Sequence, residues 1–273
     1  MKLLVLGATG MLGSGVCCAL KEEGFEVHGT FRNKTQGVCL NLKLGKAINF
    51  DASENKESLP LSDYKYVINC IGIINRLTDQ NVPNAIYINS LFPHLMARRC
   101  QDHNVKFIHI TTDCVFDGKL GKYNEDSPHY AHDVYGKTKS LGETKECMTL
   151  RTSIIGEEKH QHHSLVSWAQ SQKNKEVKGY TNHYWNGVTT HQYGKIISQI
   201  IKENLYQEDL FHIFSPNDVT KFNLLRMLSD RFHLNLNISA HTTEFLVDRT
   251  LRTTKKLQKT LFIPSVEEQI KQL

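Results

Sequence analysis

Short hydrophobic runs alternate with segments of helical periodicity over roughly the first 155 residues. Such runs are typical of strands buried on both faces of a parallel sheet, and they cover Leu3–Leu6, Glu26–Phe31, Tyr66–Ile71, Lys106–Ile110 and Met148–Ile155. Helical spacing lies between them, over Met11–Glu23, Asn84–His103 with an interruption at Pro93, and Asp133–Glu146. This alternation predicts an α/β fold with a doubly wound parallel sheet.

The pattern is looser after residue 155, where a polar stretch rich in His, Asn and Tyr begins. It is followed by a predicted helix at His191–Asn204, a strand at Leu210–Phe214, and helices at Lys221–Phe232 and Ser265–Leu273. We therefore expect two domains, a first one over residues 1–155 and a smaller C-terminal cap over residues 156–273. The helix near 191–204 is expected to return to the first domain.

Composition excludes several classes of protein. The chain has 273 residues, 40% of them hydrophobic, which is enough for a sizeable core. Its net charge of +5 comes from 33 basic and 28 acidic residues that are interspersed, so the sequence does not predict nucleic-acid binding. No segment approaches the roughly 18 uninterrupted apolar residues of a membrane span. We expect a protein of the cytoplasm with no membrane contact.

Cysteine and histidine spacing does not predict a metal site. The seven cysteines are odd in number and contain no C-x-x-C pair, which argues against a disulfide framework or a zinc site and for a reducing compartment. His160, His162 and His163 have only Glu157 and Glu158 beside them as further ligand types. A solvated turn explains this segment better than a metal centre.

The first predicted strand leads directly into a G-x-x-G-x-x-G loop that opens a helix. Glycine allows the tight turn and lets backbone N–H groups approach a pyrophosphate, while the helix amino terminus contributes a favourable dipole. This context indicates dinucleotide binding, and makes the first domain a Rossmann domain. The residues expected at the pyrophosphate are Gly7, Thr9, Gly10, Met11, Leu12 and Gly13.

The second strand ends without the acidic residue that an NAD-dependent enzyme places on the ribose hydroxyls. Arg32 stands there instead, followed by Asn33 and Lys34, and a guanidinium can pair with a 2′-phosphate. We therefore expect NADP(H) as the cofactor, with NADH as the alternative. Asp51, after the next hydrophobic run, is placed to receive the adenine amino group.

A Y-x-x-x-K pattern, Tyr135 to Lys139, lies on a predicted helix 23 residues after Thr112. The spacing places both side chains on one helix face. A neighbouring ammonium is expected to lower the pKa of Tyr135, whose phenol can exchange a proton with a carbonyl or alcohol oxygen. Thr112 is expected to hydrogen-bond the same oxygen. Gly136 and Gly142 weaken such a helix, and the sequence offers no stability reason for them.

These motifs resemble the extended short-chain dehydrogenase/reductases, and within them the dTDP-4-dehydrorhamnose reductases and related nucleotide-sugar 4-ketoreductases. The resemblance covers most of the chain and is most specific at Thr111–Gly118, Tyr123–Asp126 and Val134–Glu143. It implies that Thr112 and Tyr135 polarise and protonate a sugar ketone. It also implies that Lys139 binds the nicotinamide ribose, and that the cofactor contacts Thr111, Cys70, Ile71 and Gly72.

The chain departs from the rhamnose reductases at Cys114, where that family commonly has tyrosine. The segment Asp248–Leu251, with Lys256 and Leu257, is more similar to relatives that reduce UDP-2-acetamido-2,6-dideoxy-4-keto-hexoses. The resemblance therefore implies an acetamido-sugar substrate. Candidate substrate contacts in and around the implied cleft are Asn75, Arg76, Asp113, Cys114, Val115, Asn186, Thr190 and Arg249, the last as a diphosphate ligand.

The leading hypothesis is an NADPH-dependent oxidoreductase that reduces the 4-keto group of a UDP- or dTDP-linked 4-keto-6-deoxyhexose for deoxysugar or polysaccharide precursor synthesis. A nucleotide-sugar epimerase of the same fold is the first alternative. Dehydration is disfavoured, because dehydratases resembling this family have Asp-Glu after the catalytic Thr, and here Cys114 follows Asp113. A non-catalytic NADP-binding regulatory subunit is the second alternative. A homodimer is compatible with each.

Overall fold

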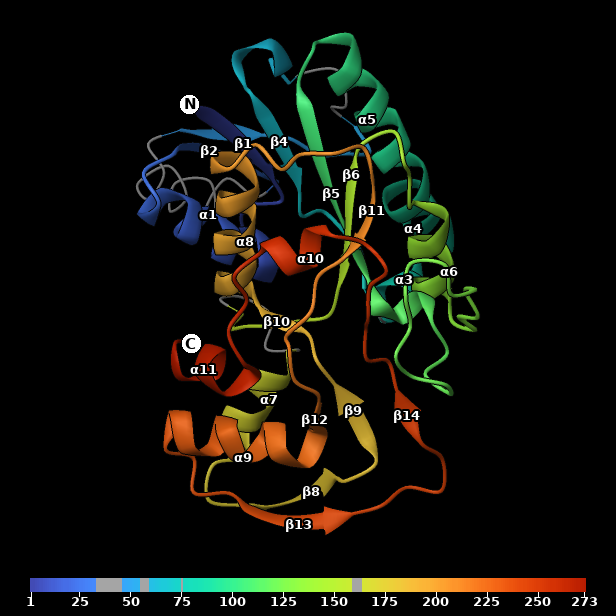
Figure 1. Cartoon of the computed structure of the whole chain (residues 1–273), viewed down its shortest axis with the longest axis vertical. Coiled ribbons are helices and arrows are strands. Elements are labelled where there is room, and N and C mark those ends of the chain that lie inside the picture. Colours follow the sequence, from blue (N-terminus) through green and yellow to red (C-terminus); the bar gives the residue numbers. More distant parts are fainter. Residues whose placement is uncertain (33–45, 55–58, 75, 159–163) are drawn as a thin grey trace.

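The computed structural model describes residues 1–32, 46–54, 59–74, 76–158 and 164–273. Its centre is a seven-stranded sheet in which all neighbouring strands run parallel (Figure 1). The predicted doubly wound parallel sheet is confirmed. Its order is β11 (Asp209–His212), β6 (Met148–Thr152), β5 (Lys106–Thr112), β4 (Tyr66–Asn69), β1 (Lys2–Leu6), β2 (Glu26–Phe31) and β3 (Ala47–Asn49).

Helices cover both faces of this sheet because its strands bury apolar side chains on both sides. Leu3 and Val5 of β1 belong to a core shared with α1 (Met11–Glu22) and α8 (Thr190–Lys202). Leu4 and Leu6 belong to the core on the opposite face, shared with α5 (Phe92–Asp102). In Figure 1, α1 and α8 lie together on one side of the sheet, and α5 and its neighbours lie on the other.

The predicted helix over 84–103 is interrupted, although not at Pro93. The structure has α3 (Arg76–Gln80), α4 (Val82–Ile86), a π-helical turn (Tyr87–Leu91) and then α5. Pro93 is the second residue of α5 and follows directly after the π-helical turn. The helix predicted over 133–146 is shorter, because α6 (Val134–Leu141) ends before Gly142.

Most of the remaining elements form a smaller lobe below the large sheet in Figure 1. Its core packs hydrophobic residues of α7 (Leu165–Ser171), α9 (Lys221–Phe232) and α11 (Val266–Lys271). Small sheets complete it, pairing β8 (Glu176–Tyr180) with β13 (Asn237–His241), β9 (His183–Trp185) with β12 (Val219–Thr220) and β14 (Val247–Asp248), and β7 (Ile154–Ile155) with β10 (Val188–Thr189). The short α10 (Leu257–Thr260) and two 3₁₀ turns, η1 (Leu61–Asp63) and η3 (Asp113–Val115), complete the named elements.

The strand expected near 210–214 does not belong to the cap. It is β11, the edge strand of the large sheet, and it pairs with β6 from Asp209↔Met148 to His212↔Arg151. Phe211 is buried in the core beneath α8, so hydrophobic contact with the first domain determines its place. The hydrophobic run over 148–155 is likewise divided, since β6 ends at Thr152 and Ile154 begins the separate strand β7.

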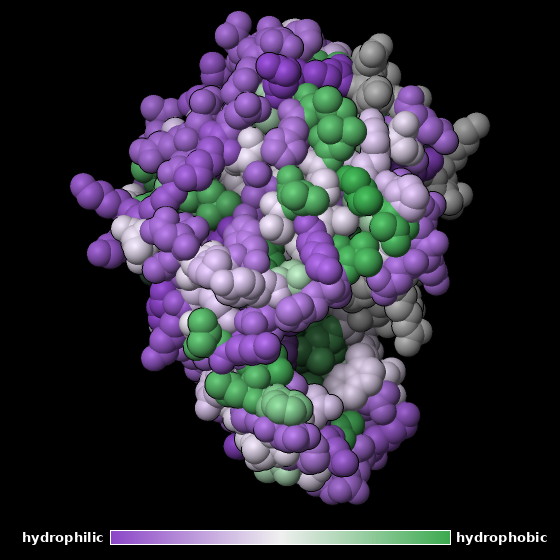
Figure 2. Space-filling model, turned by 90° about the vertical axis from the view of Figure 1, so that its right-hand side faces the viewer, coloured by the Kyte–Doolittle hydropathy of each residue, from purple (hydrophilic) through white to green (hydrophobic). Residues whose placement is uncertain are grey.

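An apolar surface lies on the face that carries α4, α5 and α6, which Figure 2 turns toward the viewer. Its exposed hydrophobic side chains are Val82, Ile86, Leu91, Leu95 and Leu141. Among the residues that the structure describes, no helix has the length and hydrophobicity needed to cross a membrane.

Gly142 allows the end of α6 to contact the π-helical turn. A Cβ at this position would lie 1.9 Å from the backbone oxygen of Asn89. Gly142→Ala should therefore lower the free energy of unfolding by about 1–3 kcal/mol, the usual cost of forcing an extra carbon into a packed interior. Denaturant unfolding measures this, with Gly72→Ala as the control because the nearest atom to its Cβ would be 3.6 Å away. Equal stability of the two variants would contradict the packing role.

Candidate functional site

A cleft of about 520 Å³ opens at the carboxyl ends of the central strands. This is the edge where parallel α/β sheets bind ligands. The structure brings most of the predicted site residues to its wall. They are Gly7, Thr9, Gly10, Met11, Leu12, Arg32, Asp51, Cys70, Ile71, Gly72, Thr111, Thr112, Asp113, Cys114, Tyr135 and Lys139.

The glycine loop has the conformation that an anion site requires. Gly7 has φ +75°, and a Cβ on Gly13 would lie 2.1 Å from the Gly7 oxygen. Gly13 therefore packs behind the loop, and the cleft wall is formed by the residues before it. Gly10 begins α1 without a side-chain cap, and the first turn of α1 has no acidic residue. Its backbone N–H groups are available to an anionic ligand.

Thr30 of β2 supports the loop, although no motif in the sequence pointed to it. Its Oγ1 accepts a hydrogen bond from the Gly7 N–H at 2.8 Å, and its backbone oxygen accepts one from Ala8 N–H at 3.1 Å. A threonine inside a hydrophobic strand is a weak signal on its own, because threonine is common in strands.

Arg32 and Asp51 lie on the same side of the cleft. Burial opposes ionisation of Asp51, but hydrogen bonds from Ser53 and the charge of Arg32 outweigh it and lower the pKa of this carboxyl. Ser53 donates through both its N–H, at 2.9 Å, and its hydroxyl, at 2.6 Å. The predictions for Asn33, Lys34 and Asn75 lie outside the described residues, as does the side chain of Arg76.

Thr112, Tyr135 and Lys139 meet where β5 ends against α6. The Asp133 carboxylate caps α6 by accepting from Gly136 N–H at 2.7 Å. A Cβ on Gly136 would lie 2.3 Å from the Cys114 oxygen, so glycine lets α6 approach the strand end. The Thr112 side chain is then hydrogen-bonded to Tyr135.

Burial controls the protonation of the two titratable groups on α6. It raises the pKa of Tyr135 far above its usual value, aided by the charges of Cys114 and Asp113 and opposed by the Thr112 hydrogen bond. The expected lowering of this pKa is wrong for this structure. Burial lowers the pKa of Lys139 to about 8 against the charge of Glu143, and the Lys139 ammonium donates to the Ile110 oxygen at 2.8 Å.

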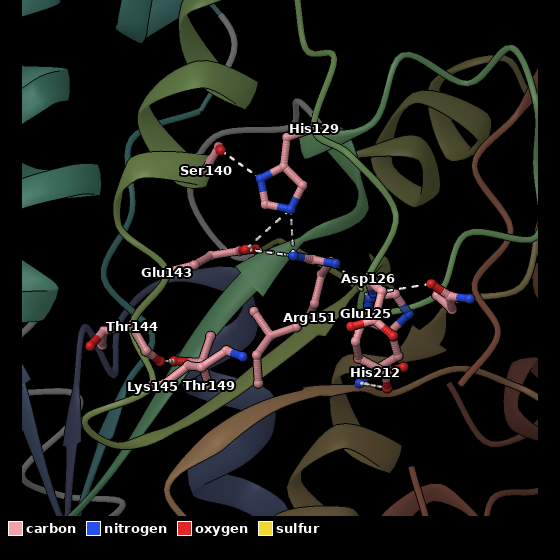
Figure 3. A network of polar contacts seen from close by, with 12 residues as sticks. Glu125, Asp126, His129, Ser140, Glu143, Thr144, Lys145, Thr149, Arg151 and His212 are labelled. Atoms are coloured by element: carbon pink, nitrogen blue, oxygen red, sulfur yellow. Dashed lines mark hydrogen bonds and ion pairs between the residues drawn. The ribbon is translucent and has the colours of Figure 1, made fainter. Parts of the chain in front are cut away.

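A polar network fastens α6 to the sheet (Figure 3). Arg151 of β6 donates to both oxygens of Glu143, through Nε at 2.9 Å and Nη2 at 2.5 Å. It also donates to Nε2 of His212 and to Nε2 of His129, each at 2.7 Å. Both imidazoles accept from a permanent cation and are neutral, and burial lowers the pKa of each. His129 Nδ1 therefore donates to Ser140, which follows Lys139 on α6.

The structure places three predicted substrate contacts outside the cleft wall. Val115 is fully buried, in a cluster with Phe116 and Tyr123. The Asn186 amide is buried and exchanges two 3.0 Å hydrogen bonds with the backbone of Leu251. Thr190 is buried at the start of α8, where its Oγ1 would lie 2.7 Å from a Cβ on Gly15. Each of these side chains is buried within the protein.

Arg249 lies close to the cleft wall without being part of it. Its Nε donates to the Phe116 oxygen at 2.9 Å, and its charge acts on the carboxyl of Asp113. Burial raises the pKa of Asp113, against Arg249, Lys221 and hydrogen bonds from Ser153 and Thr112. The role of Arg249 at a diphosphate stays a prediction.

Among the described residues, no group of three His, Cys, Asp or Glu side chains could hold a metal ion. The three neighbouring histidines at 160–163 lie outside the described residues.

Comparison with known proteins relates this fold to nucleotide-sugar enzymes. The family model of the RmlD substrate binding domain matches residues 1–257. Agl14 of Haloferax volcanii, a probable low-salt glycan biosynthesis reductase, is 30% identical over 178 residues, which cover 62% of this chain and 59% of that protein. The methionine adenosyltransferase 2 subunit beta of Xenopus laevis is 29% identical over 147 residues, covering 52% of this chain and 41% of that protein.

The matches thus span about three fifths of the length of the Haloferax protein and about two fifths of the length of the Xenopus protein. Among solved structures, dTDP-4-dehydrorhamnose reductase from Bacillus anthracis in complex with NADP has a TM-score of 0.73 at 17% identity. That match covers 99% of this chain and 97% of the other. It supports the same fold over the whole length.

The buried Lys139 ammonium should make stability depend on pH. Its pKa is about 8 in the folded chain and about 10.4 when unfolded, so between these values the unfolded chain binds the additional proton. We therefore compare the free energies of unfolding of the native protein and of Lys139→Met. Their difference should shift in favour of the native protein by up to about 3 kcal/mol as pH increases through this window. Urea unfolding at pH 7.5 and pH 10 measures it. Lys137→Met, at an exposed neighbouring position, is the control. If the free energies of unfolding of Lys139→Met and Lys137→Met changed with pH in the same way, the burial of Lys139 would be contradicted.

Proposed function

Because this chain belongs to the RmlD substrate binding domain family, whose model spans residues 1–257, we propose that it is an NADPH-dependent reductase. Its substrate would be the 4-keto group of a nucleotide-linked 4-keto-6-deoxyhexose. The observation that carries the proposal is the meeting of Thr112, Tyr135 and Lys139 in the same cleft as the uncapped glycine loop. A hydride donor and a proton donor can therefore reach one ketone.

The cleft residues fit the proposed cofactor. The N–H groups at the start of α1 would hold the pyrophosphate. Arg32 would pair with the 2′-phosphate, which favours NADPH over the alternative NADH, and Asp51 would receive the adenine. Lys139 would bind the nicotinamide ribose, with Thr111 and the segment 70–72 along the wall. When bound, the nicotinamide supplies the hydride that reduces the ketone.

The protein's own residues would handle the proton. The high pKa of Tyr135 keeps its phenol protonated at neutral pH, so it can donate to the ketone oxygen as negative charge develops there. Thr112 would donate a second hydrogen bond to that oxygen and orient it. The Lys139 ammonium, one helical turn from Tyr135, would stabilise the phenolate left after proton transfer.

A UDP-linked 2-acetamido-4-keto-6-deoxyhexose is the substrate that we favour. Cys114 lines the cleft beside Asp113, and burial raises the pKa of its thiol to about 12, so it presents a small neutral wall to the sugar. The relative in Haloferax volcanii is named as a glycan biosynthesis reductase, which supports a place in polysaccharide precursor synthesis. A dTDP-linked sugar is the alternative.

Two other functions share this fold. An epimerase would use the same Thr112, Tyr135 and Lys139 set. A non-catalytic NADP-binding subunit is supported by the similarity to methionine adenosyltransferase 2 subunit beta. The complete set of three residues in an accessible cleft favours catalysis over the second alternative.

We also propose a homodimer, which the apolar surface of α4, α5 and α6 supports. A cytoplasmic location stays a prediction.

Tyr135→Phe should lower turnover on the order of 10²-fold or more, the scale of general acid catalysis, while NADPH affinity stays nearly unchanged. The assay follows oxidation of NADPH with a panel of UDP- and dTDP-linked 4-keto-6-deoxysugars. The 2-acetamido substrate should have the highest kcat/KM. Tyr130→Phe is the matched control, since Tyr130 is 55% exposed.

Three results would contradict parts of this proposal. Full turnover in Tyr135→Phe would remove Tyr135 as the proton donor. NADPH binding by the native protein without oxidation on any sugar would favour the regulatory subunit. A higher kcat/KM for the 2-hydroxy sugar would overturn the acetamido assignment and leave the reductase in place.

A further inference from the structure

Asn69 and His109 form a polar pair inside the central sheet, directly behind the cleft wall. They are opposite each other in the register of β4 and β5, and they are 1% and 0% exposed. Each is followed in the chain by a residue that lines the cleft, Cys70 after Asn69 and Ile110 after His109. The pair is therefore adjacent to the cleft but shielded from solvent, and the function proposed above uses neither side chain.

The amide of Asn69 has one orientation that satisfies both of its ends. Its Oδ1 accepts a hydrogen bond from the Ile71 N–H at 3.1 Å, so Nδ2 is the end that faces His109 Nδ1, also at 3.1 Å. Because Nδ2 can only donate, His109 accepts at Nδ1 and carries its proton on Nε2. Burial lowers the pKa of His109 well below its usual value, and the charge of Lys139 lowers it further. The imidazole is thus neutral, in the tautomer that the amide requires.

Nε2 of His109 is a buried donor without an acceptor. Among the residues that the structure describes, it has no hydrogen-bond partner, and the imidazole is stacked on the ring of Phe107 with 6.3 Å between their centroids. A buried N–H group that forms no hydrogen bond is destabilising. An apolar side chain such as leucine would fill the same interior space without that cost. What histidine supplies here, and leucine does not, is the acceptor at Nδ1.

The Ile71 end of this arrangement packs against the glycine loop. A Cβ on Gly7 would lie 3.0 Å from Cγ1 of Ile71, and both residues line the cleft. The next part of the wall has a separate anchor, because Asn89 accepts from the Ile73 N–H at 2.9 Å and donates to the Ile73 oxygen at 2.8 Å. Asn69 therefore fixes the part of the wall nearest the glycine loop.

We propose that His109 is a positioning residue for the dinucleotide. Its Nδ1 fixes the amide of Asn69, and this amide holds the Ile71 N–H, so that the wall and the glycine loop keep the spacing that the dinucleotide needs. Without the acceptor, Nδ2 of Asn69 would be buried unpaired, or the amide would turn and lose its hydrogen bond from Ile71. This inference rests on the proposed function for the identity of the ligand, and His109 acts from behind the wall.

Two substitutions separate the acceptor from the packing of His109. His109→Leu fills the space without an acceptor, whereas His109→Asn places Oδ1 as many bonds from the backbone as Nδ1 and leaves a cavity. We expect His109→Leu to bind NADPH about tenfold more weakly, the scale of one lost hydrogen bond, with a melting temperature close to that of the native protein. His109→Asn should melt at a lower temperature but retain most of the NADPH affinity. Calorimetric titration and thermal unfolding measure the two quantities.

His103→Leu is the matched control. His103 also forms a hydrogen bond through Nδ1, with Ser62 at 2.9 Å, but it is exposed and lies at the C-terminal cap of α5, before β5 begins. Its NADPH affinity should be unchanged. His109→Phe removes the same acceptor as His109→Leu while keeping a ring against Phe107, and should bind NADPH as weakly. Amide hydrogen exchange at Ile71, followed by NMR without ligand, should be faster in both apolar variants.

The outcomes decide the assignment. Weak NADPH binding by both apolar variants, with affinity retained in His109→Asn, supports the positioning role. If NADPH affinity follows the melting temperature across the three variants, or if exchange at Ile71 is unchanged in His109→Leu, the proposal is overturned. Failure of the native protein to bind either NADPH or NADH would remove the proposed function together with this proposal. Absence of reductase activity in a native protein that binds NADPH would contradict the proposed function only, because these titrations contain no sugar.

Discussion

The buried ion pair between Arg151 and Glu143 holds α6, the helix of Tyr135 and Lys139, against the sheet, and the geometry of the site depends on it. The Arg151 side chain is 1% exposed and that of Glu143 is 7% exposed. Removal of either partner would leave a buried charge uncompensated, which is far more costly than the pair itself is stabilising. His129 and His212 each accept one further guanidinium proton. α6 is therefore anchored from the side facing β6.

The close packing of α6 against its neighbours then sets the pKa values of Tyr135 and Lys139. Gly136 and Gly142 allow α6 to approach the end of β5 and the π-helical turn to distances that a Cβ would prevent. This contact removes water from Tyr135 and Lys139, raising the pKa of the phenol and lowering that of the ammonium. A protonated phenol beside an ammonium of reduced pKa is suited to donating a proton at neutral pH. The two glycines therefore make α6 less stable as a helix. They also allow the close packing that removes water from Tyr135 and Lys139.

Local patterns in the sequence were sufficient to predict the sheet, the glycine loop and the set of Thr112, Tyr135 and Lys139. Each of these depends on the spacing of residues within one element or one turn. Long-range contacts were not predictable in this way. Arg151 meets His212 across 61 positions, and nothing in either segment alone indicates the pairing. β11 was misplaced for the same reason, and Asn186 was taken for a cleft residue although its amide is used by the backbone of Leu251.

Transfer of deuterium is the most direct test of the central claim, that a hydride and the Tyr135 proton meet at one sugar ketone. The protein is incubated with NADPH deuterated at the transferable position of the nicotinamide and with UDP-2-acetamido-2,6-dideoxy-4-keto-hexose, and the product is analysed by NMR. We expect deuterium at C4 of the sugar in a single configuration. Recovery of the keto sugar unchanged, with all label still on the nicotinamide, would contradict it.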